Sequence, residues 1–150
     1  MKKVHLPVTI ELAIANMDNS LKLYDIGNSC SLCIADSNTV KVHKVDFSPE
    51  GSKVLCGTTS ICLINVGDGS LMKEFANDSK FITCLRYSPS GNLIAVGNID
   101  GSLLFYKTDT YSRIAKTDDH GLSLRDFVFS PDGKFVVSVS DDMHINVTDL

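Results

Sequence analysis

The feature that most constrains this chain is a tight turn that recurs three times at nearly constant spacing. Each copy consists of an aromatic residue, serine, proline, a polar residue and glycine, at residues 47–51, 87–91 and 129–133. Their serines are separated by 40 residues (88 − 48) and 42 residues (130 − 88). Proline presets φ at the first central position of such a turn, and glycine accepts a conformation that other residues resist. The chain is therefore expected to repeat one structural unit about every 40 residues.

Apolar residues on both sides of each turn follow the pattern of β-strands. Three apolar positions precede the second turn, at Ile82, Leu85 and Tyr87, and the third turn is preceded in the same way. A second apolar run follows each turn, at residues 54–56, 93–96 and 135–137. Because these runs are rich in residues that suit a pleated, buried surface, and no segment has a sustained helical period, the sequence predicts an all-β fold.

A polar hairpin follows the second strand of each unit and carries an aspartate at Asp18, Asp100 and Asp142. These positions differ by 82 residues (100 − 18) and 42 residues (142 − 100), two periods and one. The missing member falls near residues 58–60, where the alignment needs a two-residue deletion, so this hairpin should be tighter than its neighbours. Fourth strands are predicted more loosely around residues 31–34, 71–75 and 112–115. The repeat segments are placed at about 1–36, 38–77, 79–118 and 120–150 within one domain.

At these positions the pattern resembles that of WD-repeat proteins, whose repeats run from a Gly-His pair to a Trp-Asp pair. Asp119-His120 stands where the Gly-His pair belongs, and Tyr24-Asp25 and Thr148-Asp149 keep the final aspartate, although the chain contains no tryptophan. The resemblance implies a β-propeller, of which this chain holds three to four blades of a presumed seven. It also implies a structural hydrogen-bond network made by His120, Ser138 and Asp142. A chain of this length cannot close a seven-bladed ring, so we expect a fragment, an incomplete gene product, or closure by another chain.

Within the family, the third repeat is most similar to the WD-repeat subunits of the superkiller complex. The similarity is carried by Lys80-Phe81-Ile82, Ala95, Gly97 and Ile99-Asp100-Gly101. Such subunits are also found in the RNA polymerase II-associated factor complex. The resemblance implies a non-enzymatic protein scaffold in cytoplasm and nucleus, with a helical-repeat scaffold and an RNA helicase of mRNA decay as partners. An adaptor of another assembly, such as a ubiquitin ligase or a signalling complex, is the alternative within the same class.

Enzymatic alternatives find little support in the sequence. His120, Ser138 and Asp142 are the residue types of a hydrolase triad, but Ser138 lies inside an apolar strand and no Gly-x-Ser-x-Gly elbow is present. The histidines do not recur at the repeat period, as a metal site in a propeller channel would require. Cys30 and Cys33 have the spacing of a metal or redox pair, but there is no second pair. We therefore expect no catalytic residues, no cofactor and no metal, with a propeller hydrolase as the alternative of a different class.

Composition adds two expectations about partners. The net charge of −4 gives no surplus of positive charge for direct nucleic-acid binding. No stretch approaches the roughly 18 apolar residues that a membrane-spanning helix needs, and Glu11 interrupts the one N-terminal run that resembles a secretory signal. The sequence therefore predicts an intracellular protein that binds neither nucleic acid directly nor a membrane.

The resemblance also indicates which residues would meet a partner. In WD-repeat proteins the loops before the first strand and between the second and third strands of each blade build one face of the ring. Carried over to this chain, that face presents six candidate partner-binding residues: Lys80, Phe81, Ile99, His120, Leu122 and Met143. For Phe81 and Leu122 the sequence leaves open a second role, packing between blades.

Overall fold

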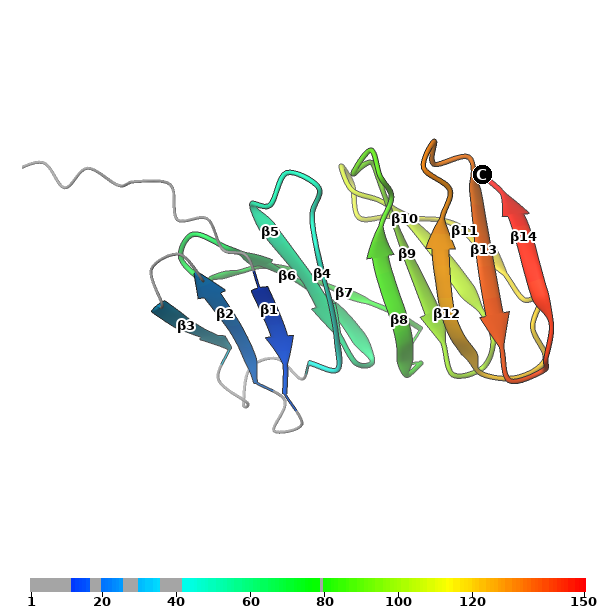
Figure 1. Cartoon of the computed structure of the whole chain (residues 1–150), viewed down its shortest axis with the longest axis horizontal. Helices are drawn as coiled ribbons and strands as arrows, with labels where there is room; N and C mark the ends of the chain where they lie inside the picture. Colours follow the sequence, from blue (N-terminus) through cyan, green and yellow to red (C-terminus); the bar gives the residue numbers. More distant parts are fainter. Residues whose placement is uncertain (1–11, 17–19, 26–29, 36–41, 79) are drawn as a thin grey trace, which may run out of the picture.

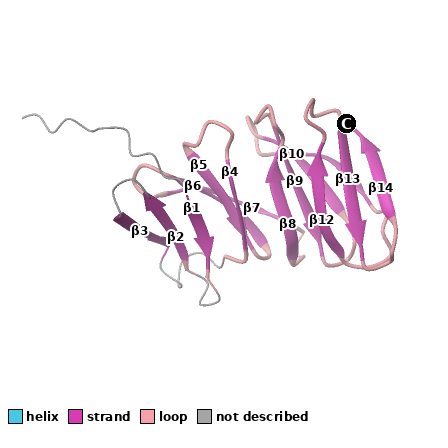
Figure 2. Ribbon diagram, viewed as in Figure 1, coloured by secondary structure: helices cyan, strands magenta, loops and turns pink. Residues whose placement is uncertain are grey.

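The computed structural model describes residues 12–16, 20–25, 30–35, 42–78 and 80–150, which form four antiparallel β-sheets (Figures 1 and 2). Asp18 lies outside the described residues, as do the side chains of Cys30 and Cys33. No helix in the described part of the chain is long and apolar enough to cross a membrane. The predicted all-β class is confirmed.

Each sheet is a meander in which strands that follow one another in sequence are paired. The first sheet holds β1 (Leu12–Ala15), β2 (Leu21–Asp25) and β3 (Cys30–Ala35). The second holds β4 (Lys44–Phe47), β5 (Lys53–Gly57), β6 (Ser60–Asn65) and β7 (Leu71–Ala76). The third holds β8 (Ile82–Tyr87), β9 (Leu93–Asn98), β10 (Leu103–Lys107) and β11 (Arg113–Thr117). The fourth holds β12 (Leu124–Phe129), β13 (Phe135–Ser140) and β14 (Ile145–Asp149).

The repeated turn joins the first two strands of the later sheets, as its sequence predicts. Its serine hydroxyl accepts a hydrogen bond from the backbone N–H five residues later, at 3.0 Å in all three turns: Ser48 with Lys53, Ser88 with Leu93, Ser130 with Phe135. The turn glycines Gly51, Gly91 and Gly133 have φ values of 73°, 73° and 71°. A side chain other than glycine is strained at such angles, which explains why glycine recurs there.

The hairpin near residue 58 is tighter than its counterparts, which confirms the expectation from the deletion. β5 ends at Gly57 and β6 begins at Ser60, so only Thr58 and Thr59 lie between them. The corresponding hairpin of the third sheet has room for residues 99–102. The short loop keeps the register of the second sheet while removing the aspartate that the longer hairpins carry.

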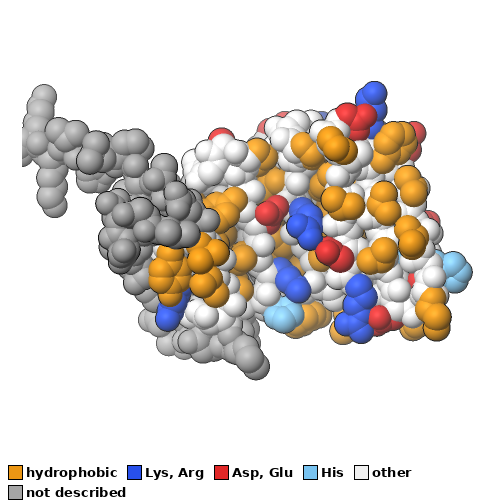
Figure 3. All heavy atoms as spheres, viewed as in Figure 1, with side chains coloured by type: hydrophobic (Ala, Val, Ile, Leu, Met, Phe, Trp, Pro, Cys, Tyr) orange, Lys and Arg blue, Asp and Glu red, His pale blue; other side chains and the backbone are white. Residues whose placement is uncertain are grey.

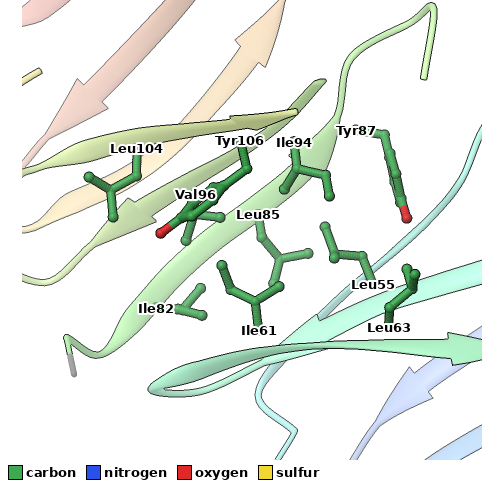
Figure 4. Close-up of a cluster of buried hydrophobic side chains, with 10 residues drawn as sticks. All are labelled: Leu55, Ile61, Leu63, Ile82, Leu85, Tyr87, Ile94, Val96, Leu104 and Tyr106. Carbon is green, nitrogen blue, oxygen red and sulfur yellow. The ribbon is translucent and has the colours of Figure 1, made fainter. Parts of the chain in front are cut away.

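Neighbouring sheets pack face to face through three apolar clusters. The cluster between the second and third sheets is shown in Figure 4, where Leu55, Ile61 and Leu63 face side chains of β8, β9 and β10. Similar clusters join the first sheet to the second and the third to the fourth. Polar contacts also cross these interfaces: the Tyr87 backbone N–H donates to Asp46 at 2.8 Å, and Arg86 Nε donates to the Phe127 carbonyl at 2.9 Å.

The stacking places strand β8 beside both β4 and β12, so the first strands of three successive sheets lie next to one another (Figure 1). Each sheet covers the apolar face of the one before it, in the manner of consecutive blades around a propeller axis. The fold is a partial β-propeller.

Candidate protein-docking face

A recess of about 220 Å³ opens where the strands β4, β8 and β12 begin. Its lining combines aromatic, aliphatic and basic side chains with two hydroxyl residues: His43, Lys44, Phe81, Thr83, Ile99, Ser123 and Arg125. Lys44, Thr83 and Arg125 belong to strands of the stacked sheets, and the other four residues lie in loops directly beside a strand. Clefts with an apolar wall and a few polar groups are typical of binding sites.

Phe81 and Ile99 form the apolar wall of this recess. Phe81 directly precedes β8 and Ile99 directly follows β9, and the Ile99 N–H donates to the Phe81 carbonyl at 3.0 Å, which ties the two loops together. The Phe81 ring lies against the His43 imidazole, with 5.0 Å between ring centroids. Phe81 is 38% exposed and Ile99 is 54% exposed. An exposed aromatic and aliphatic pair joined by a backbone hydrogen bond is well suited to anchor a partner side chain.

The hairpin between β9 and β10 is fixed by Asp100. This carboxylate accepts hydrogen bonds from the Ser102 backbone N–H and hydroxyl, and it lies 3.2 Å from Lys80 Nζ. Burial acts to raise the pKa of Asp100, but the Ser102 hydrogen bonds and Lys80 outweigh it and hold the pKa below its ordinary value. Gly101 has φ of 87°, and a Cβ there would come within 2.5 Å of the carbonyl oxygens of His120 and Leu122. Glycine at this position therefore lets the next sheet's loop approach closely.

Leu122 and Met143 are two further exposed apolar residues, both in loops of the fourth sheet. Leu122 is 54% exposed, and its carbonyl accepts a hydrogen bond from the Ser140 hydroxyl at 3.0 Å. Met143 is 94% exposed in the hairpin between β13 and β14, with φ of 64°. Neither Leu122 nor Phe81 is buried between sheets, so the exposures favour the surface role over packing between blades for both.

His120 is the one candidate partner residue that offers little surface. It is 6% exposed, and its ring lies inside the fourth sheet. Nδ1 lies 3.0 Å from Asp142 Oδ2, and Nε2 lies 2.9 Å from Ser138 Oγ. Because a carboxylate can only accept, the ring donates from Nδ1 to Asp142, and in the neutral ring Nε2 accepts from the Ser138 hydroxyl. The structure brings His120, Ser138 and Asp142 together as the family resemblance implied.

The same geometry bears on the hydrolase alternative. Ser138 is 2% exposed, and its hydroxyl is enclosed in the blade and bonded to His120. A nucleophilic serine needs access to substrate and an oxyanion hole beside it. In the part of the chain that the structure describes, no cluster of three His, Cys, Asp or Glu residues is arranged to hold a metal ion. The described residues therefore give the hydrolase alternative no support.

Sequence reasoning missed the basic residues that continue the recess along the strands. A second recess of about 190 Å³ is lined by Lys44, Arg86, Arg125 and Asp126, among others. Arg86 Nη2 lies 3.0 Å from Asp126 Oδ1, and Arg125 Nε donates to Asp141 at 2.5 Å. Figure 3 shows basic side chains and a histidine spread over β4, β8 and β12, with acidic groups between them. These residues come from strands about one period apart, so no short sequence motif marks them.

Comparison with known proteins identifies the repeat. The anaphase-promoting complex subunit 4 WD40 domain matches residues 85–150 of this chain. WD repeat-containing protein SL1-17 of Schistosoma mansoni is 28% identical over 92% of the chain and 46% of its own length. Both matches are to WD-repeat proteins.

Two further relatives match over a similar share of the chain. Eukaryotic translation initiation factor 3 subunit I of Emericella nidulans is 30% identical over 91% of the chain and 45% of its own length. WD repeat-containing protein VIP3 of Arabidopsis thaliana is 25% identical over 83% of the chain and 44% of its own length. The chain spans about half the length of these curated relatives. WD40-repeat proteins are generally non-enzymatic interaction scaffolds, and the matches are shared among several of them.

Proposed function

We propose that this chain is a docking subunit that binds other proteins through the ends of strands β4, β8 and β12 and has no catalytic activity. The observation that carries the proposal is the exposed pair Phe81 and Ile99, joined by a backbone hydrogen bond at the edge of a recess with a basic wall. Exposed apolar anchors beside a charged rim are the usual composition of a protein interface. The WD40 repeats agree with this role because loops that vary on a fixed frame make a binding platform.

For the assembly itself, we propose the superkiller complex, with a helical-repeat scaffold and an RNA helicase as partners. The similarity of the third repeat supports this choice, since Phe81 and Ile99 belong to both that similarity and the recess. The protein would then work in cytoplasmic mRNA decay and, through the RNA polymerase II-associated factor complex, in the nucleus. Translation initiation factor 3 is the second candidate, because its subunit I from Emericella nidulans is 30% identical to this chain.

Affinity purification with mass spectrometry tests both parts of the proposal. The tagged protein would be recovered from its own cells as wild type, as Ile99→Ser and as Ile114→Ser. Ile114 is the matched control: it is 49% exposed, against 54% for Ile99, but it lies on β11, the last strand of the same sheet. We expect Ile99→Ser to lose partners that wild type and Ile114→Ser retain.

The identity of the recovered proteins decides between the assemblies. A helical-repeat scaffold together with an RNA helicase supports the superkiller complex, and initiation-factor subunits support the second candidate. Equal recovery with Ile99→Ser and with wild type would contradict docking at this face. If wild type recovers no partner, the scaffold role itself is wrong.

A further inference from the structure

The two recesses at the docking face form one continuous groove. Both are lined by Lys44, Thr83 and Arg125, the first on β4, the second on β8 and the third on β12. The first recess reaches outward to Phe81 and Ile99, and the second reaches along the strands to Arg86. We call this feature the basic groove. It has an apolar outer end and a cationic inner part.

The charge of the basic groove is opposite to that of the whole chain. Its lining includes three cationic side chains, Lys44, Arg86 and Arg125, and one carboxylate, Asp126, whereas the chain carries a net charge of −4. Among the described residues, Lys44 has no carboxylate within ion-pair distance. The Lys44 ammonium is therefore available to an anionic group from outside.

The other two cations are paired, but their pairs lie at the surface. Arg86 contacts Asp126 and Arg125 contacts Asp141, and all four side chains are substantially exposed. Exposed ion pairs contribute little net stability because water screens both charges. A carboxylate from a partner can therefore take the place of Asp141 at Arg125 at small cost, whereas Arg86 is also held by the Phe127 carbonyl.

The acidic residues near the groove argue against a continuous phosphate backbone as its occupant. Asp100 stands beside Lys80 at the outer end, Asp141 stands beside Arg125, and Asp126 lies at the inner end. Nucleic acid needs several cations free to neutralise successive phosphates. A peptide with a few carboxylates and one apolar side chain fits both the spaced cations and the Phe81–Ile99 wall.

We propose that the basic groove binds an acidic peptide segment of a partner protein. An apolar side chain of that segment packs against Phe81 and Ile99, and its carboxylates pair with Lys44 and Arg125. This inference rests on the proposed docking function and specifies the chemistry of the partner. Charge complementarity of this kind raises the association rate and selects among partners.

Binding of the purified chain to an array of short immobilised peptides tests this chemistry. One set carries Asp and Glu around a single Leu or Phe. Three matched sets replace the acidic residues by Asn and Gln, by Lys and Arg, or by phosphoserine. We expect the acidic set to bind best and the Asn and Gln set to lose binding, with affinity falling between about 50 and about 200 mM salt because screening weakens charge pairing.

Variants assign the binding to the groove. Lys44→Glu and Phe81→Ser should each weaken binding of the best acidic peptide by about tenfold or more. This is the loss expected for a side chain that contributes at least about 1.4 kcal/mol to binding. Lys44→Gln provides a milder substitution that keeps the size of the side chain. Lys134→Glu is the control, since Lys134 is an exposed lysine in the turn at the opposite end of β12. Circular dichroism melting would verify that all variants are folded.

Several outcomes would overturn the inference. Preference for the neutral, basic or phosphorylated set would contradict an acidic peptide, as would absence of binding to every set or equal loss with Lys134→Glu. The docking function can be judged separately, because it depends on partners that Ile99→Ser fails to recover from cells. If those partners are lost while the array shows no acidic preference, the docking function stands and only the chemistry of the partner is wrong.

Discussion

Asp142 makes the stability contributed by the hydrogen-bond network of the fourth sheet depend on pH. Its carboxylate accepts hydrogen bonds from the backbone N–H groups of His144 and Gly121 and from His120. Burial acts to raise its pKa, but these three donors hold the pKa well below the ordinary value of 3.8. A carboxyl group whose pKa is lower in the folded state stabilises the fold above its unfolded pKa, and this stabilisation disappears as pH falls through the folded value.

We therefore expect Asp142→Asn to be less stable than wild type at about pH 7, with the difference shrinking once the pH drops below about 4. Urea unfolding of both proteins across this pH range measures the difference directly. Asp132→Asn is the comparison: the pKa of this exposed turn carboxylate is also lowered, by Ser130 and Lys134, so its effect should shrink in acid too, but it should be smaller at about pH 7 because Asp132 lies outside the His120 network. A difference between Asp142→Asn and wild type that stays constant into strong acid would contradict the assigned role.

The buried cysteines give a second prediction at the level of single residues. Cys56, Cys62 and Cys84 are buried free thiols. Burial raises the pKa of Cys62 and of Cys84 to about 11 in each case, and it raises that of Cys56 further. Since the thiolate is the reactive form, iodoacetamide should alkylate these three residues very slowly in the folded protein at about pH 8. Mass spectrometry would measure the alkylation of each cysteine, with the urea-unfolded chain as reference. Equally fast alkylation of Cys84 in both states would contradict the prediction.

At the scale of strands, two glycines let neighbouring elements approach closely. A Cβ on Gly97 would come within 2.6 Å of Cys84 Sγ and of a Leu124 methyl group, both side-chain atoms. A Cβ on Gly57 would come within 2.3 Å of the Ser60 carbonyl oxygen, a backbone atom fixed by the tight hairpin. Side chains can shift to relieve a contact more easily than a backbone held in a sheet.

Gly97→Ala should therefore destabilise the fold by about 1–3 kcal/mol, the usual cost of overpacking, and Gly57→Ala should cost more. Gly121→Ala is the control, since a Cβ at that position meets no atom within 4 Å and the change should stay within about 0.5 kcal/mol. Thermal or urea unfolding of the three variants gives the order of their stabilities. Adding Leu124→Val to Gly97→Ala should recover part of the loss, and an additive effect of the two changes would rule out the proposed contact.

The strands themselves were predictable because their signals are local. The Ser-Pro turns, the apolar runs beside them and the missing aspartate near residue 58 all lie within a few residues of the structure they determine. The basic groove was not predictable in this way, since Lys44, Thr83 and Arg125 become neighbours only when strands from three repeats align. Asn77 and Asn98 illustrate the same limit: they form a buried pair at 2.6 Å, although 21 residues separate them and neither stands out in the sequence.

At the scale of the whole molecule, the outer face of the fourth sheet differs from that of the other sheets. Val128, Val137 and Val147 form a row across β12, β13 and β14, and Val139 pairs with Ile145 beside it. These side chains are partly or largely exposed (Figure 3), whereas the third sheet's apolar face is covered by β12 and β13. A contiguous apolar face of this kind promotes association with another surface.

We expect the 150-residue chain to self-associate as its concentration rises. Burial of apolar area drives such contacts, and β14, which pairs only with β13 among the described strands, offers an edge for further pairing. Ile145→Lys and Val147→Lys should reduce association without unfolding the sheet, because both side chains are exposed. Met72→Lys makes an equal change of charge at an exposed site on β7, and it should leave self-association unchanged. Sedimentation velocity over a concentration series measures the effect, and a monomer at every concentration would show that this face does not drive association.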